Sequence, residues 1–79
     1  MPTVPGIPGP YRFFFYSFDC WEPPHVHVQR DRKLCKFWLS PVTLSSNDSY
    51  RPVELNRIRR LIFEHFARIE ETWNEHCGQ

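Results

Sequence analysis

Hydrophobic and polar residues alternate in short runs through the first half of the chain. The run "YRFFFYS" (11–17) is dense in aromatic residues, a composition typical of β-strands. The run "HVHVQ" (25–29) alternates strictly, which predicts a half-buried strand. The run "LCKFWLS" (34–40) follows a short polar turn and should return antiparallel. These runs predict a three- to four-stranded antiparallel β-meander over residues 11–44, whose fourth strand would be "VTLS" after Pro41.

The second half of the chain has a different period. After Pro52, apolar residues recur at steps of three and four, which predicts one long amphipathic α-helix over residues 52–76. Pro52 suits the first turn of this helix, and Gly78 suits its end. The apolar stripe consists of Leu55, Ile58, Leu61, Ile62, Phe66, Ile69 and Trp73. We therefore expect a single α+β domain over residues 1–79, with the meander packed on this helix and residues 1–10 as a Pro/Gly-rich arm.

Strand alternation also assigns side chains to the two faces of the predicted sheet. One set is mostly apolar and should meet the helix: Phe13, Phe15, Val26, Val28, Cys35, Phe37 and Leu39. The other set mixes aromatic rings, cations and a histidine pair: Arg12, Phe14, Tyr16, His25, His27, Gln29, Lys36 and Trp38. We expect this second face to be open to solvent and to form the functional surface.

The predicted helix is longer than the predicted sheet. Residues 52–76 would span about 37 Å as a helix, at ~1.5 Å per residue, whereas a seven-residue strand spans about 23 Å. The helix end, with Ile69 and Trp73, would then extend beyond the sheet, although burying each side chain is worth roughly 1.5–3 kcal/mol. The sequence therefore predicts a homodimer or another protein partner at this end, unless the helix kinks near His65 and packs back.

Composition and charge narrow the class of protein. The chain has 79 residues and a net charge of +1, so the strong basic field of a general nucleic-acid coat protein is excluded. Three cysteines without a C-x-x-C pair favour reduced thiols, with Cys35 in the core and Cys77 in a frayed tail. Residues 1–10 lack the charged start and continuous apolar run of a leader, so we expect a cytoplasmic protein without membrane attachment.

The histidine pair supports two kinds of chemistry. His25 and His27 should project the same way, roughly 6.5–7 Å apart at the backbone. They could serve as acid and base in RNA cleavage without a metal, with Lys36 or Arg12 stabilising the phosphorane. The rings that could stack RNA bases are Phe14, Tyr16 and Trp38. RNA is therefore an alternative partner, and a ribonuclease is the enzyme to consider.

A metal site is the lesser alternative. Two histidines need at least one further ligand, and the preceding turn offers Asp19, Cys20 or Glu22. The spacing matches no standard zinc signature. We therefore expect no cofactor, and keep a zinc-binding protein as the third hypothesis.

The segments "YRFFFYS", "EPPHVHV" and "KFWLSPV", followed by "WNE" (73–75), resemble the small bacterial proteins of domain-of-unknown-function family 4160. The resemblance covers nearly the whole chain. Such proteins are typically stand-alone and cytoplasmic, and are often encoded beside another small protein in an arrangement like a toxin–antitoxin pair. The resemblance implies a protein partner and no defined activity. The segment "QRDRKLC" departs from the family pattern, which usually has a short acidic turn with glycine. The motif positions that match are Glu22, Pro23, Pro24, His25 and His27.

The leading hypothesis is thus a small cytoplasmic protein-binding module, one half of a toxin–antitoxin-like or regulatory pair. It would dock its partner through the helix end and the histidine face. The residues expected on the binding surface are Glu22, Pro23, Pro24, Phe14, Tyr16, Trp38, Ile69 and Trp73.

Overall fold

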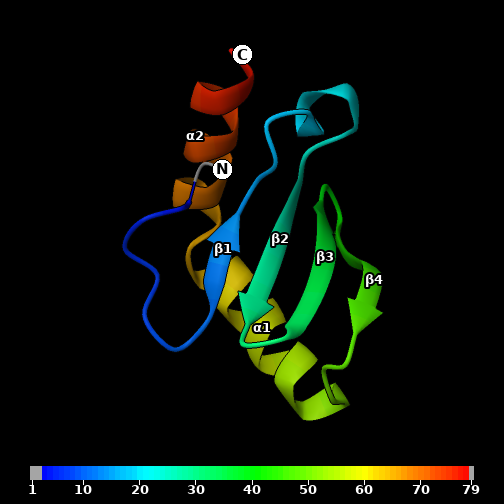
Figure 1. Ribbon diagram of the computed structural model, residues 1–79. Coiled ribbons are helices and arrows are strands. Elements are labelled where there is room, and N and C mark those ends of the chain that lie inside the picture. The colour runs from blue at the N-terminus through cyan, green and yellow to red at the C-terminus, as the bar shows by residue number, and fades with distance from the viewer. Residues whose placement is uncertain (1–2, 79) are drawn as a thin grey trace.

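The computed structural model describes residues 3–78 and has an α+β architecture. One antiparallel sheet has the strand order β1-β2-β3-β4, and two helices follow it in the chain (Figure 1). The strands are β1 (Arg12–Phe14), β2 (His25–Arg30), β3 (Lys33–Leu39) and β4 (Val42–Asp48). A short 3-10 turn, η1 (Asp19–Trp21), lies between β1 and β2, and the helices are α1 (Pro52–Glu64) and α2 (Phe66–Cys77). The predicted α+β meander with a fourth strand is confirmed.

The helical region is broken at His65, so the prediction of one helix over 52–76 is wrong. His65 has φ −115° and ψ 23°, which ends α1 and precedes α2. The backbone N–H of His65 still donates to Leu61 O at 2.9 Å, and that of Ile69 donates to His65 O at 3.0 Å. In Figure 1, α1 crosses behind the sheet and α2 lies beyond the end of β1. The alternative expectation of a kink near His65 is the one that holds.

The strand register confirms the predicted faces of the sheet. Val28 pairs with Phe13 and Cys35, and the neighbouring residue His27 pairs with Phe14 and Lys36. Paired residues project to the same side, so the apolar set and the histidine set lie on opposite faces. The buried cluster that contains the apolar face also contains Ile58 and Ile62 of α1. The alternation read from the sequence therefore places the core correctly.

The apolar end of the helical region is buried within this chain. Ile69 is 0% exposed and Trp73 is 4% exposed, and the Trp73 ring meets Phe15 edge to face at 5.3 Å. Both residues belong to the same core cluster as the sheet. The expectation that this end needs a second subunit or a partner is therefore wrong, because the break at His65 turns α2 onto the sheet end.

The two edges of the sheet differ. The N-terminal arm covers the β1 edge, where Val4 N–H donates to Phe13 O at 2.8 Å and Thr3 forms a bridge with Phe14. Within residues 3–78, no strand pairs with the outer edge of β4, and most β4 side chains are exposed.

Gly78 ends α2 in the left-handed conformation, with φ 72°, as its position in the sequence predicts.

We expect the substitution Ile69→Ala to lower the free energy of unfolding by about 2–5 kcal/mol, because it leaves a cavity in the core of the same chain. Denaturant unfolding followed by circular dichroism measures this loss. Val53→Ala is the matched control, since Val53 is exposed on α1 and should change stability by less than about 0.5 kcal/mol. A change of molecular mass in light scattering with little loss of stability would instead place Ile69 in an interface.

Candidate functional site

The carboxylate of Asp19 joins η1 to the histidine strand. Asp19 Oδ1 lies 3.2 Å from His25 Nε2, and Oδ2 lies 3.1 Å from His27 Nε2. Oδ2 also accepts a hydrogen bond from the backbone N–H of Tyr16 at 2.7 Å. Asp19 is buried, so η1 folds over the start of β2. We call Asp19, His25 and His27 the Asp–His cluster.

His25 is at the bottom of this cluster, and the prediction that it faces solvent is wrong. The side chain is 0% exposed. Its ring lies 5.6 Å from Trp38, 5.2 Å from Trp73 and 5.1 Å from His27, measured between centroids. Alternation gave the correct side of the strand, but Asp19 of η1 and Trp73 of α2 cover that side.

His27 lies nearer the surface, with its side chain 12% exposed. Its ring stacks on Phe14 at 5.4 Å and meets Tyr16 edge to face at 4.7 Å. Burial lowers the pKa of His27, and the charge of Asp19 opposes that effect. A lowered pKa favours the neutral ring at neutral pH, and in that ring Nε2 donates a hydrogen bond to Asp19 Oδ2 at 3.1 Å, which leaves the lone pair on Nδ1.

The backbone fixes the tautomer of His25. Its Nδ1 lies 2.9 Å from Pro23 O, and a carbonyl oxygen only accepts, so Nδ1 carries the proton. In the neutral ring, Nε2 then points a lone pair toward Asp19. Within residues 3–78, this buried Nε2 has no hydrogen-bond partner, and the 3.2 Å contact is an ion pair only if the ring is protonated. The cluster thus offers three donor groups within 4.8 Å of one another.

The two cations on this face are already engaged. Lys36 donates a hydrogen bond from Nζ to Glu22 Oε1, and this bond lowers the pKa of Glu22. The Lys36 ammonium also lies over the Trp38 ring, 4.4 Å from its centroid. Arg12 donates from Nε to Thr3 Oγ1 at 3.1 Å, and its guanidinium lies 4.7 Å from the centroid of Phe14. Phe14, expected on the binding surface, is buried. An acid–base pair for RNA cleavage would need both imidazoles at the surface, and only His27 reaches it.

A disulfide joins Cys20 of η1 to Cys77 at the end of α2, across 57 residues of sequence. The prediction of reduced thiols is therefore wrong for these two cysteines, and Cys77 is helical rather than frayed. Beside this bridge, His76 Nε2 lies 3.1 Å from Tyr16 O, which accepts a hydrogen bond from it. Among the three ligand candidates in the turn, Asp19 meets the histidines, whereas Cys20 is bonded to Cys77 and Glu22 pairs with Lys36.

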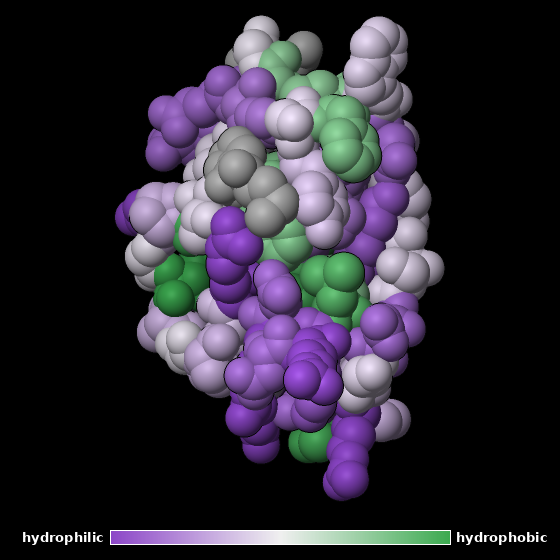
Figure 2. Space-filling model, viewed as in Figure 1, coloured by the Kyte–Doolittle hydropathy of each residue, from purple (hydrophilic) through white to green (hydrophobic). Residues whose placement is uncertain are grey.

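Two exposed aromatic residues of the turn were missed in the sequence. Trp21 is 91% exposed and Phe18 is 66% exposed, and the Phe18 ring stacks on Tyr16 at 5.5 Å. Figure 2 shows green, apolar groups among pale ones at the upper end of the view, where η1 lies in Figure 1, whereas purple, polar side chains dominate the lower end. Next to this turn in the sequence, Pro23 and Pro24 line a groove, whose other lining residues are Trp38, Ser40, Pro41 and Thr43. The signal was "FDCWEPP", where two aromatic residues stand in a turn.

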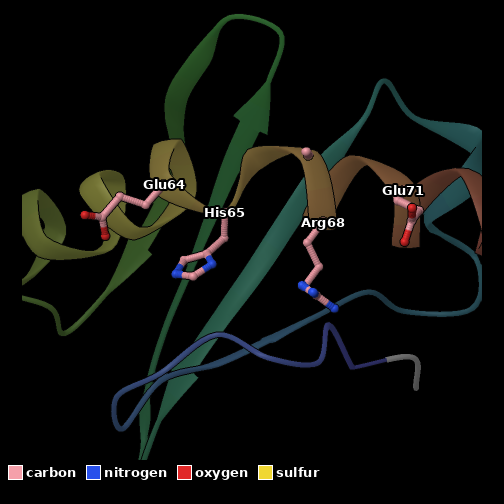
Figure 3. Close-up of a pocket in the computed structure, with 5 residues that line it drawn as sticks. Glu64, His65, Arg68 and Glu71 are labelled. Carbon is pink, nitrogen blue, oxygen red and sulfur yellow. The ribbon is translucent and has the colours of Figure 1, made fainter.

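A separate pocket lies where α1 meets α2 (Figure 3). It is lined by Glu64, His65, Ala67, Arg68 and Glu71. Arg68 points toward the N-terminal arm in Figure 3, and a Cβ added to Gly6, whose φ is +78°, would lie 3.3 Å from Arg68 Cζ. The pocket is therefore a polar seam between the helices and the arm, and we assign it no function.

The chain matches the family described as "Domain of unknown function (DUF4160)" over residues 11–74. The chain belongs to this family. The match spans the Asp–His cluster and Trp73 and leaves Cys77 outside. Comparisons with curated proteins and with solved structures find no match. Within residues 3–78, none of the helices is both long and apolar enough to cross a membrane.

We expect no thiol of the folded protein to react quickly with a thiol reagent at pH 8 before reduction. Cys20 and Cys77 are bonded, and burial raises the pKa of Cys35 to about 12, which leaves little reactive thiolate. Reduction under native conditions should expose two reactive thiols, and unfolding should expose the third. Two reactive thiols before any reduction would contradict the Cys20–Cys77 bridge.

Proposed function

We propose that this protein is a protein-binding module whose recognition surface is the aromatic loop around η1. We define the aromatic loop by Phe18 and Trp21 together with the adjoining groove of Pro23, Pro24 and Trp38. The observation that carries the proposal is the exposure of Trp21, 91%. Tryptophan is the residue type most enriched among those that dominate binding energy in protein interfaces, and a chain gains nothing for its own fold by displaying one.

The aromatic loop is held in place from beneath, which favours binding. Asp19 fixes it to both histidines and to the backbone of Tyr16, and Cys20 fixes it to α2. Pro24 O accepts a hydrogen bond from Leu39 N–H at 3.0 Å, which fixes the groove to β3. A surface ordered before binding loses less conformational entropy when the complex forms. Trp21 is therefore displayed on a rigid support.

The surroundings of the loop resemble the layout of a protein interface. The exposed rings of Phe18 and Trp21 belong to the two ends of η1, and the charged Glu22–Lys36 pair begins at the residue after Trp21. Apolar centres with polar rims are typical of interfaces. Among residues 3–78, the other large exposed apolar side chains, Leu44, Val53 and Phe63, belong to β4 and α1.

The partner that fits best is the small protein expected from a neighbouring gene, as the family resemblance implies. This would make the pair toxin–antitoxin-like or regulatory, with docking through the aromatic loop rather than through the buried helix end. The alternative is a homodimer, in which the aromatic loop binds a second copy of the chain. A cytoplasmic location stays a prediction. In the cytoplasm, thiol reductants would act on the Cys20–Cys77 disulfide, whereas an oxidising compartment would preserve it.

The substitution Trp21→Ala should weaken binding to the neighbouring gene's product at least about 30-fold, the cost of losing a hot-spot side chain of ~2 kcal/mol. Phe18→Ala should act in the same direction. Isothermal titration calorimetry with the two purified proteins measures the affinity, and circular dichroism shows that each variant is folded.

Phe63→Ala is the matched control, because Phe63 is 60% exposed on α1, close to the exposure of Phe18. It should leave the affinity unchanged. Equal losses for Phe18→Ala and Phe63→Ala, or no loss for Trp21→Ala, would move the interface away from the aromatic loop. Trp21-dependent self-association in light scattering would identify a second copy of the chain as the occupant.

A further inference from the structure

We propose that the Asp–His cluster is a binding site for a divalent transition-metal ion, with zinc as its best-fitting member. The ligands are His25 Nε2, His27 Nε2 and a carboxylate oxygen of Asp19. This inference goes beyond the proposed binding function, because it concerns the buried side of the loop and needs no partner protein.

The distances among the donor atoms suit one ion. Two ligands about 2.0–2.1 Å from a tetrahedral zinc lie roughly 3.3 Å from each other. Asp19 Oδ1 lies 3.2 Å from His25 Nε2, and the other oxygen, Oδ2, lies 3.1 Å from His27 Nε2. All the ligand atoms lie within 4.8 Å of one another, so small side-chain movements would bring them around one ion.

His25 presents a buried ring nitrogen to this cluster. Within residues 3–78, His25 Nε2 is buried and makes no hydrogen bond. Its ring is held by Nδ1–H donating to Pro23 O at 2.9 Å. A carbonyl that orients a ligating histidine through its second nitrogen is a recurrent feature of protein metal sites. A buried lone pair 3.2 Å from a carboxylate oxygen is unfavourable until a cation lies between them.

The donor set selects the class of metal. Two imidazoles and one carboxylate favour zinc or iron(II) over magnesium or calcium, which prefer oxygen ligands. Three protein ligands leave a coordination position open, as in catalytic rather than structural zinc sites. The partly exposed side chain of His27 marks the side from which solvent reaches the ion.

Two other arrangements compete with this assignment. A proton on His25 Nε2 would make an ion pair with Asp19 Oδ1, while His27 Nε2 donates a hydrogen bond to Asp19 Oδ2, so that all three groups would be engaged without a metal. A second group of potential ligands, Cys20, His76 and Cys77, also lies within 4.8 Å, but its two sulfurs form the disulfide. In the oxidised protein, these two sulfurs are therefore not available as thiolate ligands, and the Asp–His cluster is the site that a metal test would report.

The first test uses the wild-type, oxidised chain after removal of metal with a chelator. On addition of one equivalent of Zn²⁺, the ¹⁵N resonances of the His25 and His27 rings should shift, and those of His65 and His76 should stay. Mg²⁺ is the control cation and should move none of them. Unmoved His25 and His27 resonances with Zn²⁺ would leave the proton as the only cation of the cluster and would overturn the proposal.

The second test compares affinities measured with a competing chromophoric chelator. Asp19→Asn and His27→Ala should each weaken Zn²⁺ binding by at least about 100-fold, the upper range for loss of a mere supporting residue. Asp48→Asn is the matched control, because Asp48 is exposed on β4, and it should bind as the wild type does. Binding retained by Asp19→Asn and His27→Ala but lost in Cys20→Ser/Cys77→Ser would place the ion in the other group and refute the assignment.

Discussion

The packing of α2 against the end of the sheet is the constraint on which the site depends. A straight helix would carry Ile69 and Trp73 past the strands, and the break at His65 returns them to the core. Once α2 is there, Trp73 covers His25 and Cys77 reaches Cys20. The burial of apolar surface, which is the dominant favourable term in folding, thereby creates the closed environment of the histidine pair.

A buried polar cluster and an exposed aromatic loop are two sides of one segment. Asp19 points inward to the histidines, whereas Trp21, two residues later, points outward with 91% of its surface exposed. A short 3-10 turn makes this possible because its residues project in different directions over a single turn. An ion in the Asp–His cluster would hold the same turn that displays Trp21, so that occupancy of the buried site and recognition at the surface would share one support.

The sequence was a reliable guide to which face each strand residue occupies, and a poor guide to what covers that face. Val26 and Val28 lie in the core and His27 lies opposite them, as alternation predicts. His25 has the same parity as His27 but is fully buried, because it stands at the start of β2, where Asp19 of η1 and Trp73 of α2 contact it. The disulfide had no signal in cysteine spacing, since Cys20 and Cys77 lie 57 residues apart.

The sequence alone determined the α+β class, the meander, the family and the end of the last helix at Gly78. These features follow from side-chain periods of two and 3.6 and from local backbone preferences, which act between near neighbours in the chain. The tertiary structure decided that Asp19 lies on the histidines, that Trp73 is buried and that Trp21 is not. Those outcomes depend on where distant segments meet, and such contacts leave no period in the sequence.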